Sequence, residues 1–266
     1  MGCTIGAIRC KNGNLLLFKN RDLTTLKKNL PPHIQKGVKF KYLGFGADST
    51  KKNPGVWAGI NEKGLVILGA DGNSIRDFKG PKYGKGERSW QAYEESLSKT
   101  ASCKEACSYL IDFHNSNKIG GSGDIILVSD RINSAILEYS FEQWGIEFLS
   151  KNQFMVRTNF FNVLKHLRPK PETSDINLSS AIRYKRATKL LSKMGKNATV
   201  EDIMKLCQDH SKGKTPFSIC RHGKLGEYRT TASAIFEITP KFAKIYYVMN
   251  DNPCHQKYKM IKLPLA

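Results

Sequence analysis

The chain begins with the stretch MGCTIGAIRCKNGNLLLFKNRD, residues 1–22, in which two apolar runs flank a central Asn12-Gly13. Asn-Gly between apolar runs is the strongest short-range signal for a β-hairpin. If these two residues form a two-residue turn, Cys3 pairs with Asp22, and both side chains project from the same face of the sheet. The sequence therefore predicts a thiol beside a carboxylate near the start of the chain.

A cysteine at the first position of a mature chain supplies both a nucleophile and a general base. A thiol has a pKa of about 8.5 and an α-amino group one of about 7.7 to 8.0, so part of the amine is neutral near pH 7. A carboxylate at Asp22 would orient the ammonium form. This use of Cys3 requires removal of residues 1–2, with the Gly2–Cys3 bond cut through an internal thioester on Cys3 itself. The alternative is that Cys3 is a small buried residue of an N-terminal strand.

The length of 266 residues, without repeats or a Gly/Ser linker, favours one domain over residues 3–266. No apolar run approaches the roughly 18 residues of a membrane span, and no signal-peptide pattern is present, so we expect a cytoplasmic protein without a membrane partner. The seven cysteines lack CxxC spacing, which argues against a disulfide framework and against structural zinc. Cys103 and Cys107 continue an apolar helical stripe and are assigned to the core. No cofactor or metal is predicted.

The net charge of +20 comes mainly from lysine. A basic surface attracts nucleic acid, anionic lipid or an anionic small substrate. The lysines are dispersed, and the sequence has no zinc finger, no aromatic RNA-binding motif and no polybasic tail, which disfavours nucleic acid. A generally lysine-rich surface and attraction of an anionic substrate both stay open, and an oligomer is compatible with the sequence.

Groups of strands alternate with groups of helices along the chain. Strands are predicted at 4–9, 15–20, 56–60, 65–68, 124–129, 135–139, 145–149, 153–158, 230–238, 244–249 and 258–263. Helices are predicted around Trp90–Leu97, from Ser102-x-x-Glu105, over 178–194 and from Thr199-x-x-Asp202. Loops are predicted around Pro31-Pro32 and over 73–86. Hairpin-type connections favour an α+β fold, with helices outside antiparallel sheets, over a doubly wound parallel sheet.

Six segments in the same order resemble the N-terminal-nucleophile (Ntn) hydrolases of the linear amide C–N hydrolase group, which contains choloylglycine hydrolases and penicillin acyltransferases. They are Gly2-Cys3-Thr4, Lys19-Asn20-Arg21-Asp22, Gly59–Leu65, Thr158-Asn159-Phe160-Phe161, Ser180-x-x-Arg183-Tyr184-x-x-Ala187 and the segment from Thr231 to Cys254. The Gly-Cys-Thr start is more similar to the acyl-CoA:6-aminopenicillanic acid acyltransferase branch, which cleaves itself before its Cys, than to the bile-salt branch.

The resemblance implies a four-layer αββα sandwich with two antiparallel sheets between helical layers and the nucleophile at the start of a central strand. It implies that Cys3 is the nucleophile and that Asp22 is the carboxylate near its amine. It also implies that Asn159 is a polar residue of the site and that Arg183 organises the catalytic group. Without the resemblance, Asp22 and Asn159 are typical strand-end residues, and Arg183 is typical of a solvated helix face.

Two positions depart from the family pattern. The bile-salt enzymes have Arg at the position of Lys19, and the predicted register turns Lys19 to the face opposite Cys3 unless a bulge intervenes. Asp71 stands where that branch has an oxyanion-stabilising Asn, and a carboxylate repels an oxyanion. The candidates for the substrate and oxyanion region are Lys19, Asp71, Asn73 and Phe160, and the oxyanion donor stays open among Asn159, Asn73 and backbone amides.

A second cysteine–histidine grouping offers a rival nucleophile. His210 and His222 flank the segment that ends at Cys220, and a Cys–His pair is an established nucleophile arrangement. Spacing does not require this pairing, so ordinary buried or surface histidines are the simpler interpretation. Cys254 is assigned a structural role, and Arg186 is expected on a helix surface.

We therefore expect a cysteine N-terminal-nucleophile amidohydrolase that cleaves a linear, non-peptide amide of a small molecule through an acyl-enzyme on Cys3. The nearest alternative is an acyltransferase that moves an acyl group from a thioester or amide to an amine. The third interpretation is a non-catalytic basic binding protein on the same fold.

Overall fold

The computed structural model of the chain describes residues 2–24, 29–46, 55–72, 87–117, 123–140, 143–149, 154–168, 170–171, 174–224 and 226–266. The chain divides into two compact units. Unit 1 comprises Met1–Lys27, Leu149–Phe160 and Pro169–Leu265, and unit 2 comprises Lys28–Phe148, Phe161–Arg168 and Ala266. Among the described residues, no helix is both long and apolar enough to cross a membrane.

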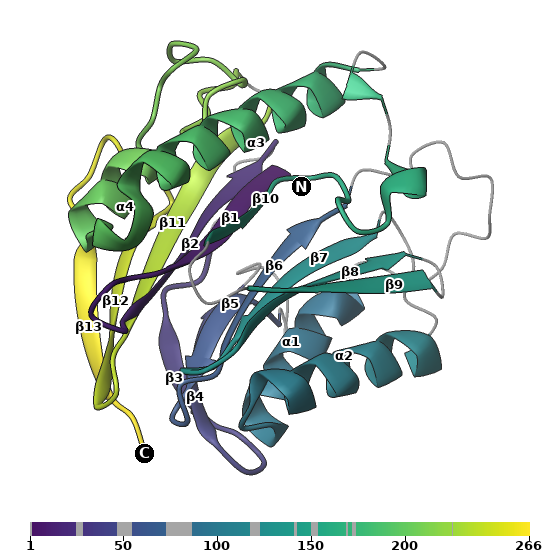
Figure 1. Cartoon of the computed structure of the whole chain (residues 1–266), viewed down its shortest axis with the longest axis vertical. Helices are drawn as coiled ribbons and strands as arrows, with labels where there is room; N and C mark the ends of the chain where they lie inside the picture. Colours follow the sequence, from purple (N-terminus) through teal and green to yellow (C-terminus); the bar gives the residue numbers. More distant parts are fainter. Residues whose placement is uncertain are drawn as a thin grey trace. The chain divides into compact units, whose positions relative to one another are not determined.

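Unit 1 contains a six-stranded antiparallel sheet whose central strands come from both ends of the chain. Its order is β10 (Phe154–Arg157), β1 (Gly2–Arg9), β2 (Leu15–Leu23), β11 (Arg229–Ile238), β12 (Phe242–Met249) and β13 (Lys259–Pro264). The helices α3 (Asp175–Met194) and α4 (Val200–Cys207), with the short 3-10 helix η4 (Gly195–Asn197) between them, pack against one face of this sheet (Figure 1). All nine residues of β2 are buried, so the strand is covered on both faces.

Both helices of unit 1 follow capping residues: α4 begins at the predicted cap, and α3 begins at Asp175, three residues before the predicted start at 178. Ser174 precedes α3, and its side chain accepts a hydrogen bond from the backbone of Asn177. Thr199 and Asp202 form the predicted capping box of α4. Apolar residues of both helices then pack with the sheet, with Leu191 and Ile203 in one core cluster beside strand residues such as Phe18 and Ile235.

The predicted hairpin at the start of the chain is confirmed, but its turn is longer by one residue. Gly13 has φ 83° and donates to the carbonyl of Cys10, while the N–H of Cys10 donates to the carbonyl of Asn14. This is a three-residue loop with glycine in the left-handed conformation. The pairing therefore shifts by one position, and Arg9 pairs with Leu15 at the end of the ladder.

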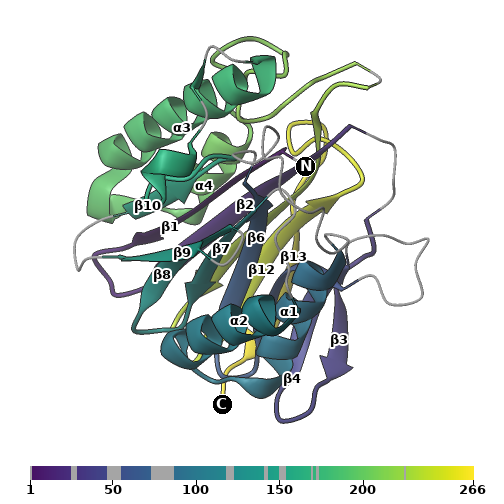
Figure 2. The same ribbon diagram turned by 90° about the vertical axis from the view of Figure 1, so that its right-hand side faces the viewer.

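Unit 2 contains a seven-stranded antiparallel sheet of consecutive strands. They are β3 (His33–Lys36), β4 (Lys41–Gly46), β5 (Val56–Asn61), β6 (Val66–Asp71), β7 (Asp124–Ser129), β8 (Ser134–Ser140) and β9 (Gln143–Phe148). The helices α1 (Glu87–Lys99) and α2 (Cys103–Asn117) lie side by side on one face of this sheet (Figure 2). Cys103 and Cys107 belong to the core between α2 and the sheet, as predicted. The 3-10 helix η2 (Lys165–Leu167) also belongs to this unit.

The predicted α+β class is confirmed by these two antiparallel sheets with helices packed on each. The strands β3 and β4 were not predicted, because the polar and proline-containing stretch before them resembles a loop. β3 is only four residues long, and its residues are exposed or half-buried, so it has no apolar pattern. The predicted loop over 73–86 lies outside the described residues.

Candidate active site

Cys3 lies at the start of β1, and only 1% of it is exposed. Its backbone N–H donates to Oδ1 of Asn159 at 2.9 Å, and its carbonyl accepts from Nη1 of Arg183 at 2.7 Å. Asn159 follows β10, the neighbour of β1, whereas Arg183 comes from α3. Unit 1 thus brings together three of the four predicted catalytic residues around one stretch of backbone.

Arg183 is buried among polar groups instead of lying on a solvated helix face. Its Nη2 donates to Oδ1 of Asn159 and its Nη1 to Oγ1 of Thr4, both at 2.9 Å, and its Nε donates to Oγ of Ser179 at 3.3 Å. Oδ1 of Asn159 therefore accepts from both the guanidinium and the Cys3 amide. These two donors hold the oxygen of the carboxamide toward Cys3.

The predicted pairing of Cys3 with Asp22 is wrong, because the longer turn shifts the register. Cys3 pairs with Arg21, and Asp22 pairs with Gly2. Since directly opposed residues share a face and successive residues alternate, the thiol of Cys3 and the carboxylate of Asp22 project from opposite faces of the sheet. The side chain of Asp22 therefore lies on the same face of the sheet as the side chain of Thr4, next to the backbone of Gly2.

The same shift corrects the prediction for Lys19. Lys19 pairs with Ile5, so it lies on the face of the sheet that also carries the Cys3 and Arg21 side chains. It is 2% exposed. No bulge in the β1–β2 ladder is needed to bring Lys19 to the side of the nucleophile.

Asp22 is completely buried and is surrounded by positive charge. Its Oδ1 accepts from Oγ1 of Thr230 at 2.9 Å, and its Oδ2 lies 3.4 Å from Nη1 of Arg221 and 3.8 Å from Nη1 of Arg183. Burial raises the pKa of Asp22, and the charges of Arg221 and Arg183 oppose that rise. Burial and the charge of Arg221 lower the pKa of Arg183 to about 9, so Arg183 stays charged at neutral pH.

Arg221, Tyr228 and Thr230 belong to the site but were not predicted from the sequence. The guanidinium of Arg221 lies over the ring of Tyr228 at 4.7 Å, and its Nε donates to the carbonyl of Pro216 at 2.8 Å. These contacts aim Arg221 at Asp22. Arg221 lies in an irregular segment about 200 positions after Asp22 in the chain. No periodic pattern in the sequence signals such a residue.

Gly2 lies in a tight space between the side chains of Arg221, Asp22 and Tyr228. A Cβ atom built on Gly2 would lie 2.3 Å from Nη1 of Arg221 and 3.3 Å from both Oδ2 of Asp22 and the ring of Tyr228. A side chain at position 2 would therefore displace the guanidinium of Arg221, and the Gly2–Cys3 peptide lies close to charged groups.

The remaining predicted residues lie in different places. Phe160 is buried in unit 1 and packs edge-on against Tyr184, with ring centroids 5.2 Å apart. Asp71 is the half-buried last residue of β6 in unit 2, and Asn73 lies outside the described residues. Arg186 forms an ion pair with Asp209, with Nη2 and Oδ2 2.6 Å apart at the surface of unit 1.

The rival cysteine–histidine grouping does assemble, although the spacing did not require it. Sγ of Cys220 lies 3.6 Å and Sγ of Cys254 3.5 Å from Nε2 of His222, which is 2.9 Å from Nε2 of His210. Burial raises the pKa of Cys220 and lowers that of His222 to about 4. The pair is therefore neutral at pH 7 and lacks the thiolate of an activated cysteine. Four such ligand atoms are instead suited to a metal ion.

Solved structures with similar folds are hydrolases. The chain aligns over 98% of its length, and over 92% of the other chain, with a mutant of the conjugated bile acid hydrolase from Clostridium perfringens, at TM-score 0.63 and 16% identity. Penicillin V acylase from Agrobacterium tumefaciens aligns with 98% and 86% coverage at TM-score 0.57 and 13% identity. The Caenorhabditis elegans orthologue of N-acylethanolamine-hydrolyzing acid amidase aligns with 88% and 92% coverage at TM-score 0.54 and 15% identity. The chain thus has the Ntn-hydrolase fold.

The sequence comparisons identify the family. No curated protein sequence matches the chain significantly. A family model described as acyl-coenzyme A:6-aminopenicillanic acid acyl-transferase matches residues 8–252, which is most of the chain. This group comprises amidohydrolases and acyltransferases that act on linear amides. The chain therefore belongs to the acyl-coenzyme A:6-aminopenicillanic acid acyl-transferase family.

Proposed function

We propose that this protein is a cysteine N-terminal-nucleophile amidohydrolase that is activated by cleavage of its own Gly2–Cys3 bond. The observation that supports this proposal is the placement of that peptide. The Cys3 N–H is held by Asn159, and Gly2 fits tightly against Asp22 and Arg221. The buried polar groups thus converge on the bond that must be cut and on the nitrogen that becomes the terminal amine.

Maturation proceeds in two steps. The sulfur of Cys3 attacks the carbonyl carbon of Gly2, the C–N bond breaks, and the departing Cys3 nitrogen takes a proton to become an amine. Water then hydrolyses the thioester, which releases the carboxylate that ends in Gly2 and regenerates the thiol. Asn159 keeps a hydrogen bond to the same nitrogen before and after cleavage, and Asp22 balances the charge of the new ammonium group.

In turnover, the Cys3 sulfur attacks the carbonyl carbon of a linear amide. The proton of the Cys3 thiol passes through the α-amine to the leaving nitrogen. Water resolves the resulting thioester. The substrate is a small molecule with an amide or acyl group, a class supported by the structural relatives, whose names refer to conjugated bile acid, penicillin V and N-acylethanolamine. The basic composition is compatible with an anionic substrate.

Intact mass spectrometry of purified protein tests the proposal. We expect the wild-type chain to begin at Cys3, and the Cys3→Ala variant to retain Gly2 and to lack amidase activity. Cys10→Ala is the matched control, because Cys10 lies at the other end of the same hairpin, and it should mature normally. A fully active chain that still carries Gly2 would refute the mechanism.

Acyl transfer is the second candidate function, because the family model that matches the chain is named for an acyltransferase. An amine, instead of water, would then attack the acyl-enzyme. Product analysis with and without an added amine distinguishes the two. If the acyl group is recovered mainly on the amine at modest amine concentrations, transfer is the main activity. If free acid predominates, the protein is a hydrolase.

A further inference from the structure

Four side chains from three segments of unit 1 form a Cys2His2 cluster that the proposed mechanism does not use. It consists of His210, Cys220, His222 and Cys254. One ligand atom from each residue lies within 4.8 Å of all the others. Cys220 is fully buried, and the other three are half-buried, so the cluster lies just below the surface.

Two sulfur–nitrogen distances in the cluster match those of a four-coordinate metal site. With metal–sulfur bonds of about 2.3 Å and metal–nitrogen bonds of about 2.0–2.1 Å, a tetrahedral site places sulfur about 3.5 Å from nitrogen. Sγ of Cys220 and Sγ of Cys254 lie 3.6 Å and 3.5 Å from Nε2 of His222. The 2.9 Å between Nε2 of His210 and Nε2 of His222 has to widen by a few tenths of an ångström.

Hydrogen bonding alone does not account for this convergence. Nε2 of a neutral imidazole has either one proton to donate or one lone pair to accept. Yet Nε2 of His222 lies within 3.6 Å of ligand atoms from His210, Cys220 and Cys254. A cation at the centre of the cluster would satisfy all four groups at once.

We propose that the Cys2His2 cluster is a structural binding site for a divalent transition metal, with Zn²⁺ as the best match. Two thiolates and two imidazoles in tetrahedral arrangement are a closed structural zinc set, with no position left for substrate. Binding displaces the two thiol protons to solvent, so the bound site is neutral overall. The side chain of Asn252 donates toward Sγ of Cys220 at 3.8 Å and to the carbonyl of Arg221 at 2.7 Å, which supports the ligand from outside.

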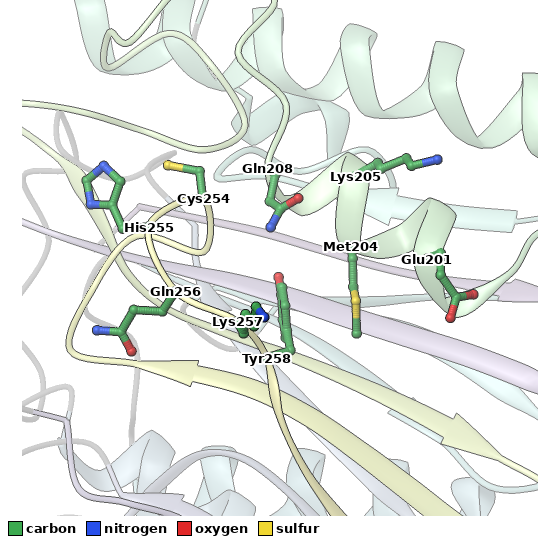
Figure 3. A pocket seen from close by; sticks show the side chains of 9 residues that line it. All are labelled: Glu201, Met204, Lys205, Gln208, Cys254, His255, Gln256, Lys257 and Tyr258. Carbon is green, nitrogen blue, oxygen red and sulfur yellow. The ribbon is translucent and has the colours of Figure 1, made fainter.

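A surface pocket gives the cluster an edge that solvent reaches. The pocket, of about 570 Å³, is lined by α4 residues and by the segment 254–258. Figure 3 shows Cys254 and His255 at the end of this pocket away from Glu201. A metal ion or a chelator can therefore approach the cluster beside Cys254.

A bound metal would restrain the segment 220–222, which reaches the active site through Arg221. Arg221 stands between the ligands Cys220 and His222, and its guanidinium lies 3.4 Å from Asp22. The metal joins this segment to His210 and to the turn that contains Cys254, after β12. The proposal goes beyond the proposed function, because a structural metal site stands whether or not Gly2–Cys3 is cleaved.

Metal analysis of tag-free protein, purified in the presence of a reductant, tests the proposal. We expect about one zinc per chain by elemental analysis. After removal of zinc, Co²⁺ should produce the visible absorption bands of a tetrahedral site with thiolate ligands. Cys254→Ser and His222→Ala should lose both signals. His255→Ala is the matched control, because the ring of His255 packs edge-on against His222 without belonging to the cluster, and this variant should keep both signals.

A second measurement, on the wild-type protein, tests the proposal even if the variants fail to fold. Treatment of the wild-type protein with a chelator should lower its melting temperature, and added Zn²⁺ should restore it, because an ion that binds only the folded state stabilises it. The proposal is overturned if reduced, folded protein binds neither Zn²⁺ nor Co²⁺, or if Cys254→Ser binds them as the wild type does. A disulfide between Cys220 and Cys254 would also overturn the proposal. So would a loss of metal in His255→Ala as large as the loss in Cys254→Ser and His222→Ala.

Discussion

At the scale of single residues, Asn159 links the nucleophile to the rest of the buried network. Its Oδ1 accepts from the amide of Cys3 and from Nη2 of Arg183, each at 2.9 Å. The position of the scissile nitrogen is therefore set by a side chain whose own orientation is held by a buried cation. Because Oδ1 of Asn159 accepts hydrogen bonds from both the peptide and the guanidinium, the Gly2–Cys3 peptide is held in one position.

Asn159→Ala should slow cleavage of the Gly2–Cys3 bond by about 5- to 150-fold. A buried N–H without its acceptor costs about 1–3 kcal/mol, and about 1.4 kcal/mol corresponds to a factor of ten in rate. Asn159→Asp retains an acceptor for both donors and should remain closer to the wild type. A mass-spectrometric time course of N-terminal processing measures both rates. Identical rates in the two variants would contradict this role for the Asn159 oxygen.

Gly2→Ala should also slow maturation, for a steric reason. The new methyl group would lie 2.3 Å from Nη1 of Arg221, so the guanidinium or the scissile peptide has to move. The same time course measures the effect, and the melting temperature serves as the control for folding. Processing at the wild-type rate would show that the space around Gly2 is not tight in solution.

At the scale of elements, the loop of the first hairpin decides which residues face each other at the active site. Three loop residues instead of two pair Cys3 with Arg21 and turn Asp22 to the other face. This difference is local, because a two-residue hairpin turn of type I′ or II′ needs a positive φ at Asn12, whereas of these two residues only Gly13 has one, at 83°. Asn-Gly is compatible with both loop lengths, so the sequence predicted the hairpin correctly and its register wrongly.

Gly13→Ala should lower the free energy of unfolding by about 1–2 kcal/mol, the cost of a left-handed conformation for a residue with a Cβ. No atom lies within 4 Å of the position of that Cβ, so the cost arises from the backbone alone. Gly13→Asn is the control, because asparagine tolerates this conformation and should be less destabilised. Urea denaturation measures both variants. Equal losses would argue against a conformational origin.

The two helices of unit 2 are joined by a small polar cluster. Oε2 of Glu95 on α1 accepts from Nζ of Lys99 and from the hydroxyl of Tyr109 on α2, both at 2.6 Å. Although burial alone would raise the pKa of Glu95, these hydrogen bonds outweigh it and lower the pKa below its ordinary value. The stabilisation is therefore present above the ordinary pKa of a glutamate and is lost as the pH falls through the lowered value.

Glu95→Gln should reduce stability by at most about 1 kcal/mol at pH 7, because the side chains of Glu95 and Lys99 are partly exposed to solvent. The difference from wild type should shrink as the pH falls below the ordinary glutamate pKa, about 4.3. Urea denaturation at neutral and acidic pH measures it, with Asp112→Asn at an exposed position of α2 as the control. A difference that grows on acidification would contradict the lowered pKa.

At the scale of the whole molecule, the sheet of unit 1 is assembled from segments that lie far apart along the chain, whereas the sheet of unit 2 is built from consecutive strands. The sheet of unit 1 places β2 between β1 and β11, so Asp22 and Thr230 become neighbours. The Cys2His2 cluster arises in the same way, from residues that span positions 210 to 254. The cysteine spacing argued against zinc because sequence motifs detect only ligands that are close along the chain.

The sequence by itself determined the class of the fold, most of the strands and helices, and Cys3 as a candidate nucleophile, whereas Asn159 and Arg183 became candidates only through the resemblance to a known family. Hydrophobic periodicity and capping residues act over a few neighbouring positions, which is why they can be recognised from the chain alone. Only the tertiary structure decided the register at Cys3, the enclosure of Asp22 by Arg221 and Thr230, and the Cys2His2 cluster. Those features depend on contacts between segments that no local pattern relates, because they form only when the sheet and its loops close around them.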